Sequence, residues 1–257
     1  MSDETVLISR DGPVATVTMN LPGSMNAFNE KLRFALRDTL VDAAYDDDIR
    51  AIVLTGAGRA FSPGADLKEG ISPSVERQLN FQYRPIFDAI TSAQKPVIAA
   101  LNGFAAGVGL SVAMACDLVV MADNAFLLSP FTAISLVPDG GATWFLVRQL
   151  GYKRAYQMSI EGERIKAEDA RDMGLVNRVE PADELLNKTQ AWAAELSKKA
   201  PLSLAATKRA MRLAMHGSYE DVYRMEALLQ QTCMVSDDAA EGVAAFLEKR
   251  EADFKGK

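Results

Sequence analysis

One carboxylate in this sequence, Asp139, lies between a proline and two glycines in the segment SLVPDGGATW (135–144). The residues that follow, DGGATWFLVRQL, have the apolar spacing of an amphipathic helix. An aspartate at this point can cap the helix by accepting hydrogen bonds from its first backbone N–H groups. It can also act as a general base, provided that burial raises its pKa from the ordinary value of about 3.9. The residues alone leave both roles open.

A second segment that could do chemistry is GFAAGVGLSVAMA (103–115), a glycine-rich turn that leads into a helix. The first N–H groups of a helix have no partner within it, and together with the helix dipole they favour negative charge. Such a turn could therefore hold a negatively charged group. Glycines at these positions could equally serve the close packing of a helix on a strand.

The composition restricts the classes of protein to which these segments could belong. Of 257 residues, 49% are hydrophobic and 24% are charged, which is the balance of an ordinary globular protein. The formal net charge of −6 argues against a nucleic-acid partner, because contacts with phosphates need clustered Lys and Arg. An acidic N-terminal segment, and no apolar run long enough to cross a bilayer, predict a cytoplasmic protein without a membrane partner. Cys116 and Cys233 lack metal-ligand spacing, so we expect neither a disulfide nor a metal site.

Apolar periodicity predicts an α/β fold. Two runs rich in Val, Ile and Thr flank RDGP and predict a β-hairpin, and the next segment predicts an amphipathic helix with Asn29 as its N-cap. Short apolar strands at 51–56, 96–103 and 117–122 alternate with helical segments, one of which runs through 76–93, and this alternation favours parallel pairing.

The C-terminal part of the chain has a different pattern, which is almost wholly helical. We therefore expect a core over residues 1–195 and a helical region over 196–257. Helices of this length are marginal alone, so they must bury their apolar sides against the core or a neighbouring subunit.

Six segments, taken in order, resemble the crotonase, or enoyl-CoA hydratase/isomerase, superfamily. They cover nearly the whole chain, and their order makes the resemblance specific. The segments are NAFN (26–29), LTGAGRAFSPGADLKE (54–69), KPVIAALNGFAAGVGLSVAMACDLVVMA (95–122), LVPDGGATW (136–144), EGERIKAEDARDMGLVNRV (161–179) and EGVAAFLEKREADFKGK (241–257).

This resemblance implies a spiral of ββα turns with a C-terminal helical region, assembled as a homotrimer or a dimer of trimers and acting on acyl-CoA thioesters. It assigns two backbone N–H donors for the thioester oxygen, those of Ala65 and Val108. Coenzyme A is then part of the substrate, and no separate cofactor is expected. The residues that the resemblance places in the substrate groove are Ala27, Ala65, Asp66, Leu67 and Lys68, with Phe254 and Lys257 approaching the nucleotide from a neighbouring subunit.

The chain departs from the hydratases of this superfamily at two positions. Those enzymes use two glutamates, and their positions are occupied here by Ser111 and Phe131, neither of which is a base near neutral pH. Phe131 could instead give the pocket an apolar wall, and Ser111 could pack, cap or contact substrate. Asp139, followed by Gly-Gly-x-Trp with Trp144, resembles the subset with a single aspartate base, such as the ring-opening 1,2-epoxyphenylacetyl-CoA isomerase.

Three functions follow from these expectations. The first is an acyl-CoA isomerase in which Asp139 moves a proton, since one base suffices for a 1,3-proton shift. The second is an enoyl-CoA hydratase that uses Asp139 as a substitute base. The third is an acyl-CoA-binding subunit that has no catalytic activity.

Overall fold

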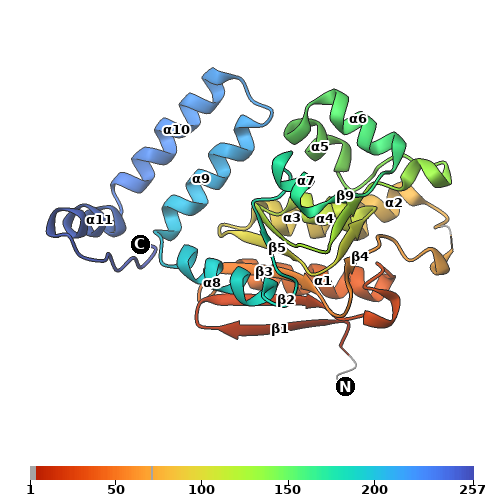
Figure 1. Ribbon diagram of the computed structural model, residues 1–257. Coiled ribbons are helices and arrows are strands. Elements are labelled where there is room, and N and C mark those ends of the chain that lie inside the picture. The colour runs from red at the N-terminus through yellow and green to blue at the C-terminus, as the bar shows by residue number, and fades with distance from the viewer. Residues whose placement is uncertain (1–3, 71) are drawn as a thin grey trace.

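The computed structural model describes residues 4–70 and 72–257, which form two β-sheets surrounded by helices (Figure 1). The larger sheet has six strands in the order β1-β2-β3-β5-β7-β10, and the smaller has four in the order β4-β6-β8-β9. The strands are β1 (Val6–Asp11), β2 (Val14–Met19), β3 (Ala51–Gly56), β4 (Ala60–Ser62), β5 (Val97–Leu101), β6 (Phe104–Ala106), β7 (Leu118–Ala122), β8 (Phe126–Leu128), β9 (Ile165–Lys166) and β10 (Arg178–Glu180). The helices are α1 (Glu30–Tyr45), α2 (Val75–Gln78), α3 (Arg84–Ser92), α4 (Val108–Ala115), α5 (Ala142–Leu150), α6 (Tyr152–Glu161), α7 (Ala167–Asp172), α8 (Leu185–Ser197), α9 (Pro201–Ala214), α10 (Tyr219–Met234) and α11 (Asp237–Glu248).

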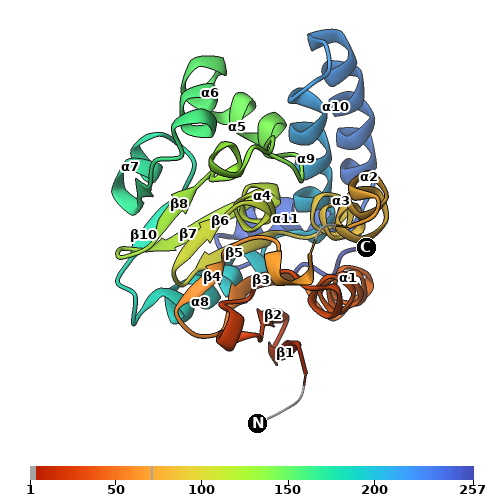
Figure 2. The same ribbon diagram turned by 90° about the vertical axis from the view of Figure 1, so that its right-hand side faces the viewer.

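Successive turns of the chain add one strand to each sheet and then continue into helices. β3, β5 and β7 are parallel neighbours in the larger sheet, while β4, β6 and β8 are parallel neighbours in the smaller one (Figure 2). This repeat confirms the predicted spiral of ββα turns. Because parallel strands end at the same edge, the segments that follow β4, β6 and β8 lie close together.

The N-terminal elements form where local sequence signals predict them. Gly12 and Pro13 form the two-residue turn between β1 and β2, one position later than the expected Asp-Gly, and Gly12 has a positive φ of 53°, which suits glycine. Helix α1 begins after Asn29, whose side chain accepts the N–H of Leu32 at 2.9 Å. The buried side of α1, which includes Leu36, packs against β1 and β2 and joins the hydrophobic core.

The helical segment expected over residues 76–93 is present from Val75 to Ser92, but its hydrogen-bonding pattern changes along its length. The structure has α2, then a π-helical segment at Leu79–Tyr83, then α3. Pro85 lies in the first turn of α3, a position where proline is tolerated because the N–H it lacks would have no partner in the helix. Tyr83, at the end of the π segment, is buried, and π-helical turns are frequent at functional sites.

Helices α9, α10 and α11 make up the C-terminal region, in which α9 and α10 form a hairpin that extends away from the sheets (Figure 1). Asp117, just before β7, holds α9 to the core through Lys208 (2.7 Å) and Arg212 (2.9 Å). Large apolar side chains are exposed on these helices, Met211 and Phe246 among them. The predicted trimer would cover some of them, and it stays a prediction. Within residues 4–70 and 72–257, no helix has the length and apolar character needed to span a bilayer.

Candidate active site

The first part of the site is the turn that follows β4. Phe28 and Ala65 form an isolated parallel bridge, in which the Phe28 N–H donates to the Gly64 carbonyl (2.8 Å) and the Asp66 N–H donates to the Phe28 carbonyl (3.2 Å). The bridge uses the groups on either side of Ala65, so the N–H of Ala65 itself points away from Phe28. The structure thus brings the NAFN loop, with the buried Ala27, against the SPGAD turn, as the predicted groove requires.

Helix α4 begins against this turn. Val108 is its first residue, so the Val108 N–H has no partner within the helix. A Cβ atom placed on Gly64 would lie 3.3 Å from the Val108 nitrogen and 3.0 Å from the Ala106 carbonyl oxygen. Gly64 and Gly107 also have positive φ values of 105° and 54°. The glycines therefore allow two turns to approach closely, and these adjacent turns carry the two predicted donors, Ala65 and Val108.

Asp139 lies between β8 and α5, but its side chain does not cap the helix. The N-cap of α5 is Gly141, with φ of 81° and no side-chain hydrogen bond, and the first helical residue is Ala142. The backbone carbonyl of Asp139, not its carboxylate, accepts the Ala142 N–H (3.0 Å). Among the described residues, Oδ1 of Asp139 is buried and has no hydrogen-bond partner. The capping interpretation is therefore wrong for this side chain.

Burial raises the pKa of the Asp139 carboxyl to about 6, and a hydrogen bond from its own backbone N–H opposes this rise only in part. A general base works best when its pKa lies near the operating pH. Asp139 is therefore mostly ionised at neutral pH, yet it binds a proton more readily than an exposed aspartate with a pKa of about 3.9. This is the chemistry that the base interpretation requires.

Comparison with known proteins identifies the family. The sequence profile of the enoyl-CoA hydratase/isomerase family matches residues 9–257. The chain belongs to the enoyl-CoA hydratase/isomerase family. It is 39% identical to a probable enoyl-CoA hydratase of Rhodobacter capsulatus over the whole of both chains, and 34% identical to 1,2-epoxyphenylacetyl-CoA isomerase of Escherichia coli over 99% of both. The crystal structure of an enoyl-CoA hydratase from Polaromonas sp. JS666 matches with a TM-score of 0.92 at 32% identity, covering 97% of this chain and 99% of that chain.

Ser111 and Phe131, which stand where the resemblance expects the glutamates of family hydratases, both lie beside the start of α4. Ser111 is fully buried, and its hydroxyl donates to the Asp139 carbonyl oxygen at 2.8 Å. Phe131 is 7% exposed, and its Cζ lies 3.9 Å from where a Cβ on Gly107 would be. Neither side chain of this enoyl-CoA hydratase/isomerase family member can act as a base near neutral pH, which leaves the carboxylate of Asp139 as the candidate base beside α4.

Trp144 lies in the first turn of α5 and borders a cavity of 370 Å³ beside the Asp139 loop. Its lining comes from α5, α3, the π segment and the two glycines after Asp139, and it combines four aromatic side chains with polar ones such as Arg84 and Asp88. Trp144 packs edge-on against Phe145, with ring centroids 5.1 Å apart, and stays partly exposed. The structure thus places Trp144 next to the Asp139 loop, and its predicted contact with the substrate stays a prediction.

Tyr83, Arg33 and Glu69 join the site although the sequence analysis did not single them out for it. Arg33 is 3% exposed, donates to Glu69 at 2.9 Å and places its guanidinium carbon 5.3 Å from the centre of the Tyr83 ring. Glu69, which a surface turn would leave in water, is thus held in an ion pair. Burial raises the pKa of the Tyr83 phenol, Arg33 opposes this, and the charges of Asp139 and Glu69 raise it further. Tyr83 therefore lies within electrostatic reach of Asp139.

The remaining groove residues form an exposed turn next to Ala65. Asp66 accepts the Lys68 N–H at 3.0 Å and caps the short 3-10 helix Leu67–Glu69, while Leu67 is 70% exposed. The predicted contact of these residues with an acyl-CoA stays a prediction.

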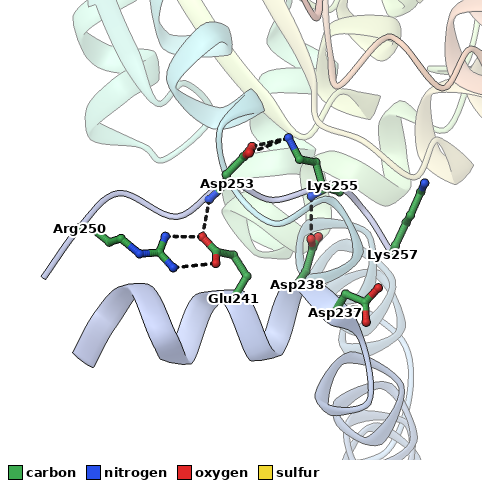
Figure 3. Close-up of a pocket in the computed structure, with 7 residues that line it drawn as sticks. All are labelled: Asp237, Asp238, Glu241, Arg250, Asp253, Lys255 and Lys257. Atoms are coloured by element: carbon green, nitrogen blue, oxygen red, sulfur yellow. Dashed lines mark hydrogen bonds and ion pairs between the residues drawn. The ribbon is translucent and has the colours of Figure 1, made fainter. Parts of the chain in front are cut away.

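Phe254 and Lys257 lie elsewhere, in the C-terminal tail: the Phe254 ring lies against Gly242 of α11, and Figure 3 shows Lys257 near the start of that helix. The Phe254 carbonyl accepts a hydrogen bond from Arg50 at 2.9 Å, and the Lys257 carbonyl accepts the N–H of Asp238 at 3.1 Å. Within one chain this tail does not join the turns that carry Ala65 and Val108. The approach of Phe254 and Lys257 to the nucleotide from a neighbouring subunit stays a prediction.

Proposed function

We propose that this chain is an acyl-CoA isomerase that shifts a double bond in an enoyl-CoA thioester, or opens a ring, by proton transfer through Asp139. The observation that carries the proposal is the Asp139 carboxylate, whose Oδ1 is buried without a partner among the described residues and whose pKa is raised to about 6. The N–H groups of Ala65 and Val108 hold the thioester oxygen. Coenzyme A enters and leaves as part of the substrate, and no separate cofactor takes part.

The proton movement balances with one carboxylate. With a 3-enoyl thioester, Asp139 takes a proton from C2, and the electron pair moves towards the thioester oxygen to give a dienolate. The two backbone N–H groups stabilise that oxyanion, an interaction whose loss typically costs about 3–4 kcal/mol per donor. Protonated Asp139 then returns the proton to C4, and the double bond forms between C2 and C3. This cycle needs only one base, and neither Ser111 nor Phe131 supplies a second one.

Hydration is a second candidate, which the name of the Rhodobacter capsulatus relative favours. In that reaction Asp139 would take a proton from water, and the oxygen of that water would enter the product at C3. The Asp139 carboxylate would then have to act without the second glutamate that the family resemblance associates with hydration.

Isotopic labelling separates the two reactions. The purified chain is given a 3-enoyl-CoA and, separately, a 2-enoyl-CoA in water enriched in oxygen-18. We expect the 3-enoyl-CoA to be isomerised at least about tenfold faster than the 2-enoyl-CoA is hydrated, with no label in the isomerised acyl group. Faster formation of a labelled 3-hydroxyacyl-CoA would support the hydratase. Acyl-CoA binding with no turnover of either substrate would support the non-catalytic subunit.

A further inference from the structure

Ser111 connects the candidate base to the helix that carries one of the oxyanion donors. Its hydroxyl lies 2.8 Å from the Asp139 carbonyl oxygen and 3.4 Å from the carbonyl of Gly107, one turn back in its own helix. A hydroxyl has a single proton to donate, and the shorter contact takes it. A serine in a helix commonly bonds to its own preceding turn, whereas this one bonds across to the Asp139 loop.

The residue after Asp139 fits the same surface of α4. Gly140 has a positive φ of 60°, and a Cβ placed on it would lie 2.7 Å from Phe87 Cζ, 3.0 Å from Ser111 Cβ and 3.1 Å from Val108 Cγ2. The loop is thus seated directly on Ser111 and Val108. The buried Oδ1 of the carboxylate adds no hydrogen bond to this seating among the described residues.

We propose that Ser111 is a positioning residue, which anchors the Asp139 backbone to α4 and so fixes the carboxylate relative to the Val108 N–H. The inference rests on the proposed function for its consequence in catalysis, but the anchoring itself is independent of which reaction the chain performs. A misplacement of about 1 Å between reacting groups can cost about 10²-fold in rate. Removing the anchor should therefore slow the chemical step more than it weakens substrate binding.

The test compares Ser111→Ala with Ser197→Ala. Ser197, at the end of α8, is also buried and donates its hydroxyl to a backbone carbonyl at 2.8 Å, that of Ala194. Both variants lose one buried hydroxyl and one hydrogen bond of the same length, and only the first lies at the site. We expect Ser111→Ala to lower kcat on a 3-enoyl-CoA by about 10- to 100-fold with KM within about twofold, and Ser197→Ala to change neither by more than about twofold.

A second readout does not need turnover. The carboxyl of Asp139 is titrated by carbon-13 NMR in wild type and both variants, and its signal is assigned by its absence from Asp139→Asn. A loosened loop exposes the carboxylate to water, so its pKa should fall in Ser111→Ala and stay in place in Ser197→Ala. If wild type shows no isomerisation, the proposed function fails. A lower pKa of Asp139 in Ser111→Ala would still support the anchoring role of Ser111. An unmoved titration, with kcat no lower than in Ser197→Ala, would overturn the inference.

Discussion

Asp139 and Asp238 each have a carboxylate oxygen that is removed from water, but the two carboxylates differ in their hydrogen-bond partners. Asp238, in the first turn of α11, is 4% exposed, and its two oxygens accept the N–H groups of Lys255 (2.6 Å) and Gly256 (2.8 Å); Figure 3 shows the first of these bonds. Oδ1 of Asp139 is equally withdrawn but has no such partner among the described residues. A paired carboxylate stabilises the fold, whereas an unpaired one costs folding free energy and remains available for chemistry.

The two aspartates also differ in which of their atoms hold the surrounding chain in place. The C-terminal tail is fastened through the Asp238 carboxylate, and a bidentate ion pair between Glu241 and Arg250 (2.6 and 2.8 Å) supports the same tail (Figure 3). The Asp139 loop is held through its backbone, by Ser111 and the N–H of Ala142, which leaves the carboxylate without a structural task. Of these two aspartates, only Asp238 therefore has a structural role that its carboxylate performs.

The largest effect that we predict is a loss of activity on replacing Asp139, with no such loss on replacing Asp238. Asp139→Asn keeps the shape of the side chain but cannot accept the proton, so the turnover of a 3-enoyl-CoA should slow by about 10²–10⁴-fold. Steady-state assays of Asp139→Asn and Asp238→Asn, side by side, measure this. Equal activity of Asp139→Asn and wild type would show that another group moves the proton.

The fold of Asp139→Asn provides the control. Because the folded pKa of Asp139 lies above the unfolded value, the folded state binds this proton more tightly, and the associated stability is lost as pH rises from about 4 to 6. At pH 7 the asparagine removes that cost, and we expect the free energy of unfolding to rise by about 1–2 kcal/mol. A variant that is inactive because it has unfolded would show the opposite change.

The next effect in size concerns stability alone. In Asp238→Asn the amide NH₂ must face one of the two backbone N–H groups of the tail, so one hydrogen bond is lost and a buried donor is left unpaired. We predict a loss of about 1–3 kcal/mol in the free energy of unfolding, measured by urea denaturation. The kcat of the folded variant should stay within about threefold of wild type. A folded Asp238→Asn as inactive as Asp139→Asn would break the comparison between the two residues.

What could be predicted from the sequence depends on how local each interaction is. The Asn29 cap and the turn at Gly12 join residues a few positions apart, and both formed, the turn one position later than expected. Tyr83, in the π-helical turn before Pro85, packs against Arg33, some 50 residues earlier, and helical periodicity reports neither the turn nor this contact. The one signal of this contact in the sequence is that Arg33 lies next to apolar positions of the expected helix, and such a signal is weak.

The candidate site shows the same limit. The order of the motifs identified the turns that carry Ala65 and Val108, and the structure brings these turns together. Whether Asp139 caps a helix or is left unpaired depends on where Gly141 starts α5 and on Ser111, which lies 28 positions away. The sequence therefore left that choice open, since both roles use the same residue types.

The central claim is that the base is the half-buried Asp139 carboxylate, whose Oδ1 is buried without a hydrogen-bond partner among the described residues, and the pH dependence of turnover tests it most directly. The experiment follows kcat/KM for the isomerisation of a 3-enoyl-CoA, kept well below its KM, by wild type from about pH 4.5 to 8, with the fold monitored by circular dichroism throughout. The pKa of about 6 in the free chain predicts a constant kcat/KM above about pH 7 and a tenfold fall for each pH unit well below 6, with the same limb in Asp238→Asn. A kcat/KM that stays constant down to about pH 4.5 in folded protein would contradict the claim, because the working group would then be an ordinary carboxylate or none.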